Sequence, residues 1–146
     1  MRPRPPFLRL QFIWSVLPVP VIVLPRLPGR LIGVCLGPAV AVHRDWAADW
    51  PTIVHELEHC KQFWRGGLVL HFLRYTLSRR YRLESELQAF DAELRACRPD
   101  DRPARLEDAA RALATGYRLG LDAGACRHLL AARVRGEAPS HDTSAG

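Results

Sequence analysis

The chain has 146 residues, of which 48% are hydrophobic, which is enough for one domain with a core of its own. Its formal net charge is +6, and Lys61 is the single lysine among 21 basic residues. The arginines are dispersed and form no basic helix interleaved with aromatic residues, so no specific nucleic-acid partner is expected. Its four cysteines are widely spaced and form no C-x-x-C pair, which favours reduced thiols in a cytoplasmic protein.

The N-terminal segment is rich in proline and arginine, and residues 1–18 are expected to form a flexible leader. The apolar run from Phe12 to Leu24 is interrupted by two prolines and is shorter than the roughly twenty residues that a membrane-spanning helix needs. Val19 to Leu24 is therefore predicted to form a β-strand. Membrane association through residues 7–24 is the alternative to a cytoplasmic location.

The remaining pattern predicts an α+β fold, with a small N-terminal β-sheet followed by a helical core and C-terminal supporting helices. Residues 31–35 and 39–43 are rich in β-branched side chains and are separated by Gly37-Pro38, which predicts two short strands and a tight turn. Helices are expected after Asp49 up to Gly66-Gly67, and then over 68–77, 82–96, 106–117 and 121–134. Residues 1–135 are expected to form a single domain, and 136–146 a disordered tail that is small and polar.

The first of these helices contains His55-Glu56-Leu57-Glu58-His59, an H-E-x-x-H motif. Residues four apart lie on one face of an α-helix, so His55 and His59 can bind a single Zn²⁺. Glu56 projects beside them, where it can take a proton from water held by the metal. Cys60 is rotated about 100° from the neighbouring histidine and is expected in the core.

Catalytic zinc usually has three protein ligands, so a third one is expected elsewhere in the chain. Gln62 and Arg65 stand where the metzincin extension would require glycine and histidine, which excludes that class. The helix predicted over 82–96 carries the acidic candidates, which are Glu84, Glu86, Asp91 and Glu93.

The motif and the downstream sequence Glu86-Leu87-Gln88-Ala89 together resemble a minimal form of the gluzincin zinc metallopeptidases, as in small bacterial proteins of this kind. The resemblance covers about residues 50–97. It implies that the ligands are His55, His59 and Glu86, and that Glu56 is the general base.

In the same family a small residue, here Ala89, lets the two helices approach, and larger members use a further acid to hold a zinc histidine. Asp91 lies about 140° around the helix from Glu86, which places it poorly for that role. Glu84, two residues before Glu86 on another face, is the alternative third ligand.

Other polar residues near these helices are expected mainly to pack. His43 ends a predicted strand, and His71 lies among apolar residues of the 68–77 segment. Tyr75 and Tyr81 lie between the two metal-binding helices, where a phenol could stabilise an oxyanion. His71 and Tyr81 are the candidates for that donor.

The resemblance implies a zinc-dependent metalloendopeptidase that hydrolyses peptide bonds in a peptide or protein substrate. One alternative is a zinc-binding structural or interaction protein that cleaves nothing. Another is an intracellular zinc peptidase that cleaves transcriptional repressors, which the E-x-x-A-F sequence at residues 86–90 also resembles. The sequence leaves the oligomeric state open.

Overall fold

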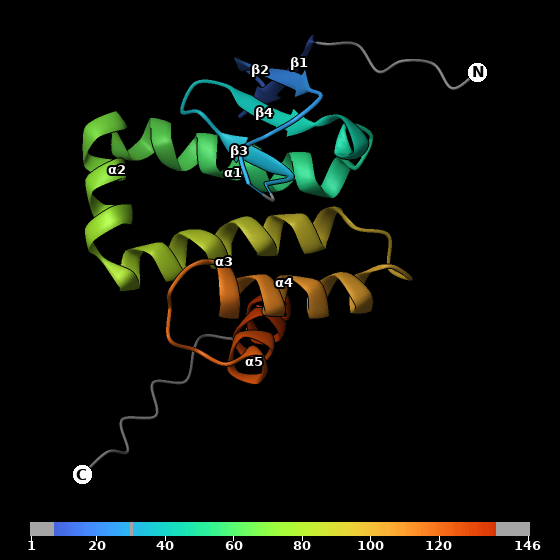
Figure 1. The fold of residues 1–146 in the computed structure, drawn as a ribbon, viewed down its shortest axis with the longest axis vertical. Helices are drawn as coiled ribbons and strands as arrows, with labels where there is room; N and C mark the ends of the chain where they lie inside the picture. The colour runs from blue at the N-terminus through green and yellow to red at the C-terminus, as the bar shows by residue number, and fades with distance from the viewer. Residues whose placement is uncertain (1–7, 30, 137–146) are drawn as a thin grey trace.

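The computed structural model describes residues 8–29 and 31–136, and within them a four-stranded sheet is followed by helices (Figure 1). The predicted α+β fold with an N-terminal sheet is confirmed. The strands are β1 (Leu8–Ile13), β2 (Leu17–Leu24), β3 (Gly33–Cys35) and β4 (Val40–His43). After a short 3-10 turn at Arg44–Trp46 come α1 (Trp50–Gly66), α2 (Leu68–Leu77), α3 (Arg79–Ala96), α4 (Arg102–Gly116) and α5 (Ala123–Val134).

The sheet has the strand order β1-β2-β4-β3, so β1 and β3 are its edges. β1 and β2 form an antiparallel hairpin, β2 and β4 are parallel, and β3 pairs antiparallel with β4. The expected strands over 19–24, 31–35 and 39–43 correspond to β2, β3 and β4. Of the two edge strands, β3 is the one that lies against α1.

The flexible leader expected over residues 1–18 is wrong for its second part. Residues 8–18 form β1, the connecting turn and the beginning of β2, with cross-strand pairs from Leu8 with Ile22 to Ile13 with Leu17. Residues 1–7 lie outside the described part of the chain, as do residues 137–146 of the expected disordered tail. Alternating apolar residues in β1 pair with the proline-containing β2, which sets the register of the hairpin.

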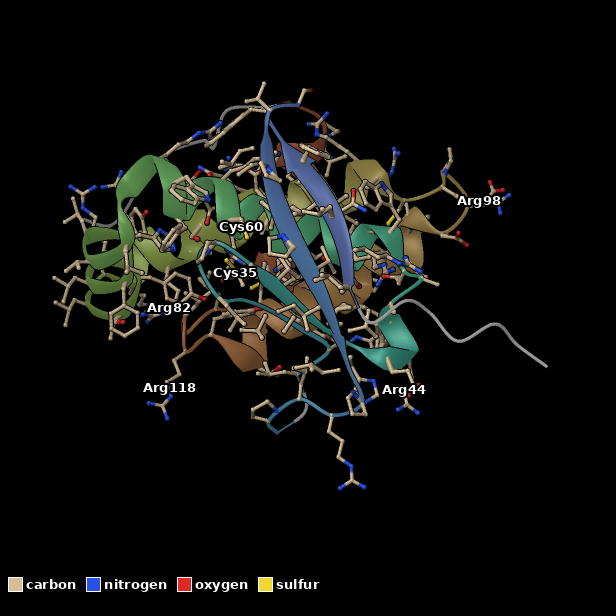
Figure 2. The ribbon with its side chains drawn as sticks, turned by 90° about the horizontal axis from the view of Figure 1, so that it is seen from above. Cys35, Arg44, Cys60, Arg82, Arg98 and Arg118 are labelled. Carbon is tan, nitrogen blue, oxygen red and sulfur yellow. The ribbon has the colours of Figure 1, made fainter. Side chains whose placement is uncertain are left out.

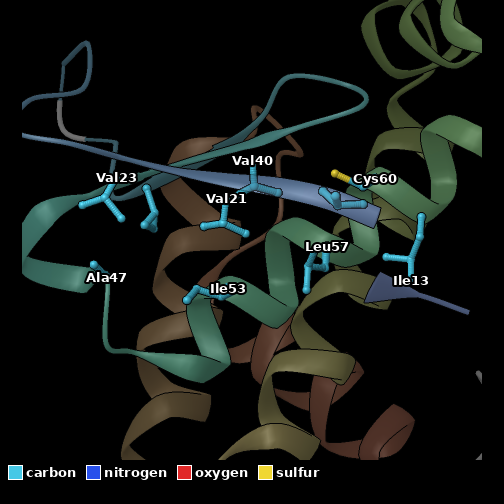
Figure 3. Close-up of a cluster of buried hydrophobic side chains, with 10 residues drawn as sticks. Ile13, Val21, Val23, Val40, Ala47, Ile53, Leu57 and Cys60 are labelled. Carbon is cyan, nitrogen blue, oxygen red and sulfur yellow. The ribbon is translucent and has the colours of Figure 1, made fainter. Parts of the chain in front are cut away.

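One hydrophobic core lies between the sheet and α1 (Figure 3). β2 directs Val19, Val21 and Val23 inward because alternate strand residues share a face. α1 meets them with buried residues at helical spacing, among them Ile53 and Leu57. Packing on the sheet thus fixes one side of the helix that carries the H-E-x-x-H motif.

A second core joins α3, α4 and α5 on the other side of the molecule. The structure is layered in the order sheet, α1, α3, and then α4 with α5, while α2 links α1 to α3 at one end of the stack (Figure 1). α1 and α3 therefore lie side by side between two apolar clusters. This layer between the cores is where the candidate site forms.

The described helices include none that is both long and apolar enough to cross a membrane. Residues 8–24, part of the segment considered for membrane association, form β1, a turn and β2.

The start of α1 depends on Asp49, whose carboxylate accepts hydrogen bonds from the Thr52 N–H at 3.1 Å and from Thr52 Oγ1 at 2.5 Å. Arg105 Nη2 donates to the same carboxylate at 2.6 and 2.7 Å. We expect Asp49→Ala to lower the free energy of unfolding in urea by about 1–3 kcal/mol, through loss of the cap and of the ion pair. Asp101→Ala is the matched control, because Asp101 precedes α4 without a side-chain cap bond.

The stabilisation by Asp49 should also depend on pH. Burial alone would raise the pKa of Asp49, but hydrogen bonds from Thr52 and Arg105 outweigh burial and lower it. A depressed folded-state pKa stabilises the protein above the ordinary aspartate pKa of about 4 and loses that effect as the pH falls through the folded value. The free energy of unfolding should therefore differ most between wild type and Asp49→Ala at neutral pH, and this difference should become smaller in acid. An equal decrease in the free energy of unfolding in Asp49→Ala and Asp101→Ala at neutral pH would contradict the capping role.

Candidate metal centre

The antiparallel packing of α1 against α3 brings the polar side chains of the two helices together in order. Moving along α1, His55 faces Glu93 and Glu86, His59 faces Glu86, and Gln62 faces Ser85. The partner numbers fall as the α1 numbers rise, as antiparallel helices require. Ala89 is fully buried one turn after Glu86, where its small side chain suits two helices in close contact.

His55, His59 and Glu86 form a group that could hold a metal ion, with one ligand atom from each within 4.8 Å of the others. Glu86 Oε2 lies 3.7 Å from His55 Nε2, and Glu86 Oε1 lies 3.4 Å from His59 Nε2. Tetrahedral ligands bound at about 2.1 Å from zinc lie about 3.4 Å apart, so these spacings fit such an ion.

One oxygen of the Glu86 carboxylate has no hydrogen-bond partner among the described residues, and a bound metal ion would provide one interaction for it. Its residue is 1% exposed, and Oε2 is the one fully buried side-chain oxygen or nitrogen without a hydrogen-bond partner within residues 8–29 and 31–136. A buried unpartnered carboxylate oxygen costs free energy, which a bound cation would offset. The donor set of two imidazoles and one carboxylate is therefore consistent with a divalent metal.

The other nitrogen of each histidine is held by an acceptor. His55 Nδ1 lies 2.9 Å from Glu93 Oε2, and His59 Nδ1 lies 3.0 Å from Gln62 Oε1. Gln62 is itself fixed, since its Nε2 donates to the Ser85 carbonyl at 3.0 Å and its Oε1 accepts from Ser85 Oγ at 2.5 Å. Because both acceptors take a proton from Nδ1, the lone pairs of the neutral rings lie on Nε2, which faces Glu86.

Charges in this layer shift the protonation of the ligands when no ion is bound. Burial alone would lower the pKa of His59, but the Glu86 and Glu56 carboxylates outweigh it and raise that pKa to about 9. Burial alone would raise the pKa of Glu86, but His59, His55 and the Tyr75 hydroxyl lower it below its usual range. Both shifts reflect the attraction between the His59 imidazolium and the Glu86 carboxylate, so protons compete with a cation for these ligands.

Glu56 lies next to this group and is also buried. Burial raises the pKa of its carboxyl, although His55, His59 and a backbone hydrogen bond from Cys35 act in the opposite direction. Its carboxylate lies against β3, where a Cβ on Gly33 would come within 2.8 Å of Glu56 Oε1. Glycine at position 33 thus leaves the space that this carboxylate occupies.

The aromatic candidates occupy different places. Tyr75 of α2 reaches the site, since its hydroxyl donates to Glu86 Oε1 at 2.5 Å, and burial with the nearby Glu86 charge raises its pKa. His71 Nδ1 lies 2.9 Å from the Tyr81 hydroxyl, which pairs these two candidates with each other. His43 lies at the end of β4 beside Asp45, away from the metal group.

Two cavities with shared lining residues border the site. One, of about 480 Å³, includes His59, Glu86 and Tyr75, and has apolar walls from Leu36, Phe63, Leu68 and Phe72. The other, of about 670 Å³, includes Thr52, Glu93, Arg105 and Trp46. Both include Gly33, His55, Glu56 and Tyr117, so the two cavities meet the site at His55 and Glu56, beside Gly33 of the edge strand β3.

Of the two candidate third ligands, the structure brings Glu86 into the group and leaves Glu84 outside it. Glu84 is exposed, forms an ion pair with Arg133 Nη1 at 2.8 Å and accepts a hydrogen bond from Gln88 Nε2 at 3.0 Å. Asp91 was expected to be poorly placed to hold a zinc histidine, and its carboxylate indeed pairs with Arg95 at the surface. The acid that holds His55 is Glu93, which the sequence indicated only as a possible ligand.

Comparisons with protein-family models, with curated proteins and with solved structures found no match.

The contact of Glu93 with His55 leads to a testable expectation for metal affinity. Glu93→Gln should weaken zinc binding by about 10–100-fold, because the amide no longer holds the Nδ1 proton with a charged acceptor. Asp91→Asn, two residues earlier and paired with Arg95 at the surface, should bind zinc as the wild type does. Competition with a zinc-chelating dye measures both affinities. Equal affinities in the two variants would show that Glu93 does not orient the ligand.

Proposed function

We propose that this protein is a zinc-dependent peptidase of the gluzincin type. The observation that carries the proposal is the arrangement of Glu56 and the metal group. Both histidine Nε2 atoms face the Glu86 carboxylate, and Glu56 lies beside them at the wall that the two cavities share. Three ligands, a neighbouring carboxylate and open space next to them are what hydrolysis at a zinc site requires.

When bound, zinc supplies a Lewis acid that polarises a carbonyl and makes water more acidic. His55, His59 and Glu86 would hold it, and Glu93 and Gln62 would keep the two rings in the required tautomer. Glu56 accepts the proton of the attacking water and then donates it to the leaving amine. The same carboxyl group both takes up and releases the proton, and burial raises its pKa when no ion is bound.

The groove beside β3 favours an extended peptide as the substrate. β3 pairs only on its β4 side within the described sheet; its outer edge offers main-chain groups to a further strand, although the Cys35 N–H there already donates to the Glu56 carboxylate. A peptide lying there would pass Glu56 and the ligands between the two cavities. The open space beside the ligands favours turnover over a purely structural zinc site, whose fourth position is normally closed by protein.

Tyr75 is the side chain best placed to assist at the carbonyl oxygen. Its hydroxyl lies at the Glu86 carboxylate and lines the same cavity as His59, whereas Tyr81 is paired with His71 outside that contact. With a cation bound to Glu86, the phenol would be able to turn its single O–H from that carboxylate to the developing oxyanion. We therefore assign to Tyr75 the role for which the sequence offered His71 and Tyr81 as candidates.

Metal content provides the first test of this proposal. Purified wild type should contain about one zinc per chain by plasma mass spectrometry, as a single three-ligand site requires. Glu86→Ala should lose the metal, while Glu84→Ala, the matched control from the same helix, should retain it. Zinc retained by Glu86→Ala or absent from a zinc-supplied wild type would contradict the ligand set.

The role of Glu56 requires a separate test of catalysis. Glu56→Gln should keep its zinc and lose at least about a thousandfold in peptidase kcat/KM on a mixed peptide library, because an amide cannot accept the proton. Glu58→Gln is the control, since Glu58 lies in the same motif but pairs with Lys61 at 2.7 Å. If Glu56→Gln turned over substrate at the wild-type rate, Glu56 would not be the base.

A further inference from the structure

The arrangement of polar and apolar residues on α2 is the reverse of what a helix at the surface of a water-soluble domain normally shows. Its polar and aromatic residues His71 and Tyr75 face inward, towards Tyr81 and Glu86. None of its ten residues is buried. Its large apolar side chains are instead exposed, from 45% for Leu73 to 79% for Leu77; we call this set the apolar face of α2, and it comprises Leu68, Val69, Leu70, Phe72, Leu73 and Leu77.

The position of α2 leaves this face uncovered within the described chain. α2 crosses one end of the layered structure and is joined to α1 at Gly67, whose positive φ of 72° lets the chain turn sharply. Figure 1 shows α2 at the margin of the molecule, and Figure 2 shows it to one side of the sheet when seen from above. A contiguous apolar surface of this kind usually marks a binding site.

The charges around α2 indicate what binds there. The chain from Lys61 to Leu83 contains six basic and no acidic residues. The exposed members are Arg65, Arg74, Arg79 and Arg80, and no carboxylate among the described residues pairs with any of these four. The next acid, Glu84, is paired with Arg133. Apolar side chains next to arginines that have no carboxylate partner in the described chain match a surface with an apolar interior and a negatively charged outer layer.

Tryptophans lie next to this face. Trp64, in the last turn of α1, is 46% exposed, and the exposed Trp14 of the β1–β2 turn has the Arg65 guanidinium 5.5 Å from the centre of its ring. Tryptophan is enriched where a membrane protein meets the interface between headgroups and hydrocarbon. A second copy of the chain is a poorer occupant, because a twofold contact through this face would bring the arginines of the two copies together.

We propose that the apolar face of α2 docks onto an anionic lipid surface. The helix lies in the interface plane, with its leucines and Phe72 among the acyl chains and the surrounding arginines at the headgroups. Membrane contact through α2 differs from the attachment considered for residues 7–24, which rested on a possible anchor. It needs no metal, so it stands or falls independently of the peptidase proposal.

Co-sedimentation of the full chain with vesicles tests this proposal. Wild type should bind vesicles of phosphatidylcholine with about 30% phosphatidylglycerol at least tenfold more tightly than vesicles of phosphatidylcholine alone. The double variant Leu73→Ser with Leu77→Ser should weaken binding to the anionic vesicles about tenfold or more. The double variant Arg74→Glu with Arg80→Glu should weaken it to a similar extent. Added salt should weaken the binding of the wild type to anionic vesicles.

A matched control is available on the other apolar surface of the molecule. Leu8 and Leu10 of β1 are each 60% exposed on the outer face of the sheet, close to the mean exposure of Leu73 and Leu77. Leu8→Ser with Leu10→Ser should bind anionic vesicles as the wild type does. Circular dichroism and zinc content of every variant show that the fold and the metal centre are intact.

Several results would overturn the proposal. They are an absence of binding to anionic vesicles at low salt, equal binding to the neutral vesicles, and an equal loss in the β1 control. A dimer in light scattering that dissociates in the Leu73 and Leu77 variant, without vesicle binding, would instead assign the face to a second copy of this chain.

Discussion

The burial of the Glu86 carboxylate between His55 and His59 is the interaction on which the arrangement of the other elements depends. An isolated buried carboxylate costs several kcal/mol, so the residues around it must supply positive charge or hydrogen bonds. The His59 ring and the Tyr75 hydroxyl supply part of this at Oε1, and Oε2 is left for a cation. The apolar clusters on either side hold α1 and α3 in place, so the polar layer between them cannot relax by moving apart.

The C-terminal helices were expected only to support the fold, but α4 also contributes a charged residue to the polar layer between α1 and α3. Arg105 of α4 lies with Nη1 3.4 Å from Glu93 Oε1 and with Nη2 2.6 Å from Asp49 Oδ2. It thereby connects the N-cap of α1 with the acid that holds His55 Nδ1. The position of a candidate ligand on α1 thus depends on α3 through Glu93 and on α4 through Arg105. Such a chain of charged contacts holds a ring orientation more firmly than a single hydrogen bond can.

The sequence predicted the helices and three of the four strands, because glycine, proline and periodic apolar residues mark their limits. It did not predict β1, since prolines and arginines around it outweighed the alternation of Leu8, Leu10 and Phe12. In the site, local spacing predicted the H-E-x-x-H pair, but the third ligand came from a family resemblance. Glu93 lies seven residues after Glu86, within about 20° of the same helix face, so helical periodicity could have indicated it. The roles of Gln62, Gly33 and Arg105 depend on contacts between elements, and no local pattern shows such contacts.

α2 shows how two requirements can act on one short helix. Its inner face must place the Tyr75 hydroxyl at Glu86 and His71 at Tyr81, which brings polar atoms to the side that a surface helix normally buries with leucine. Its outer face then carries the leucines, and Leu68 and Phe72 belong both to this face and to the wall of the 480 Å³ cavity. If a lipid surface covers the outer face, this cavity lies next to that surface. A peptidase site arranged in this way would favour substrates held near the bilayer, a consequence that requires both proposals to hold.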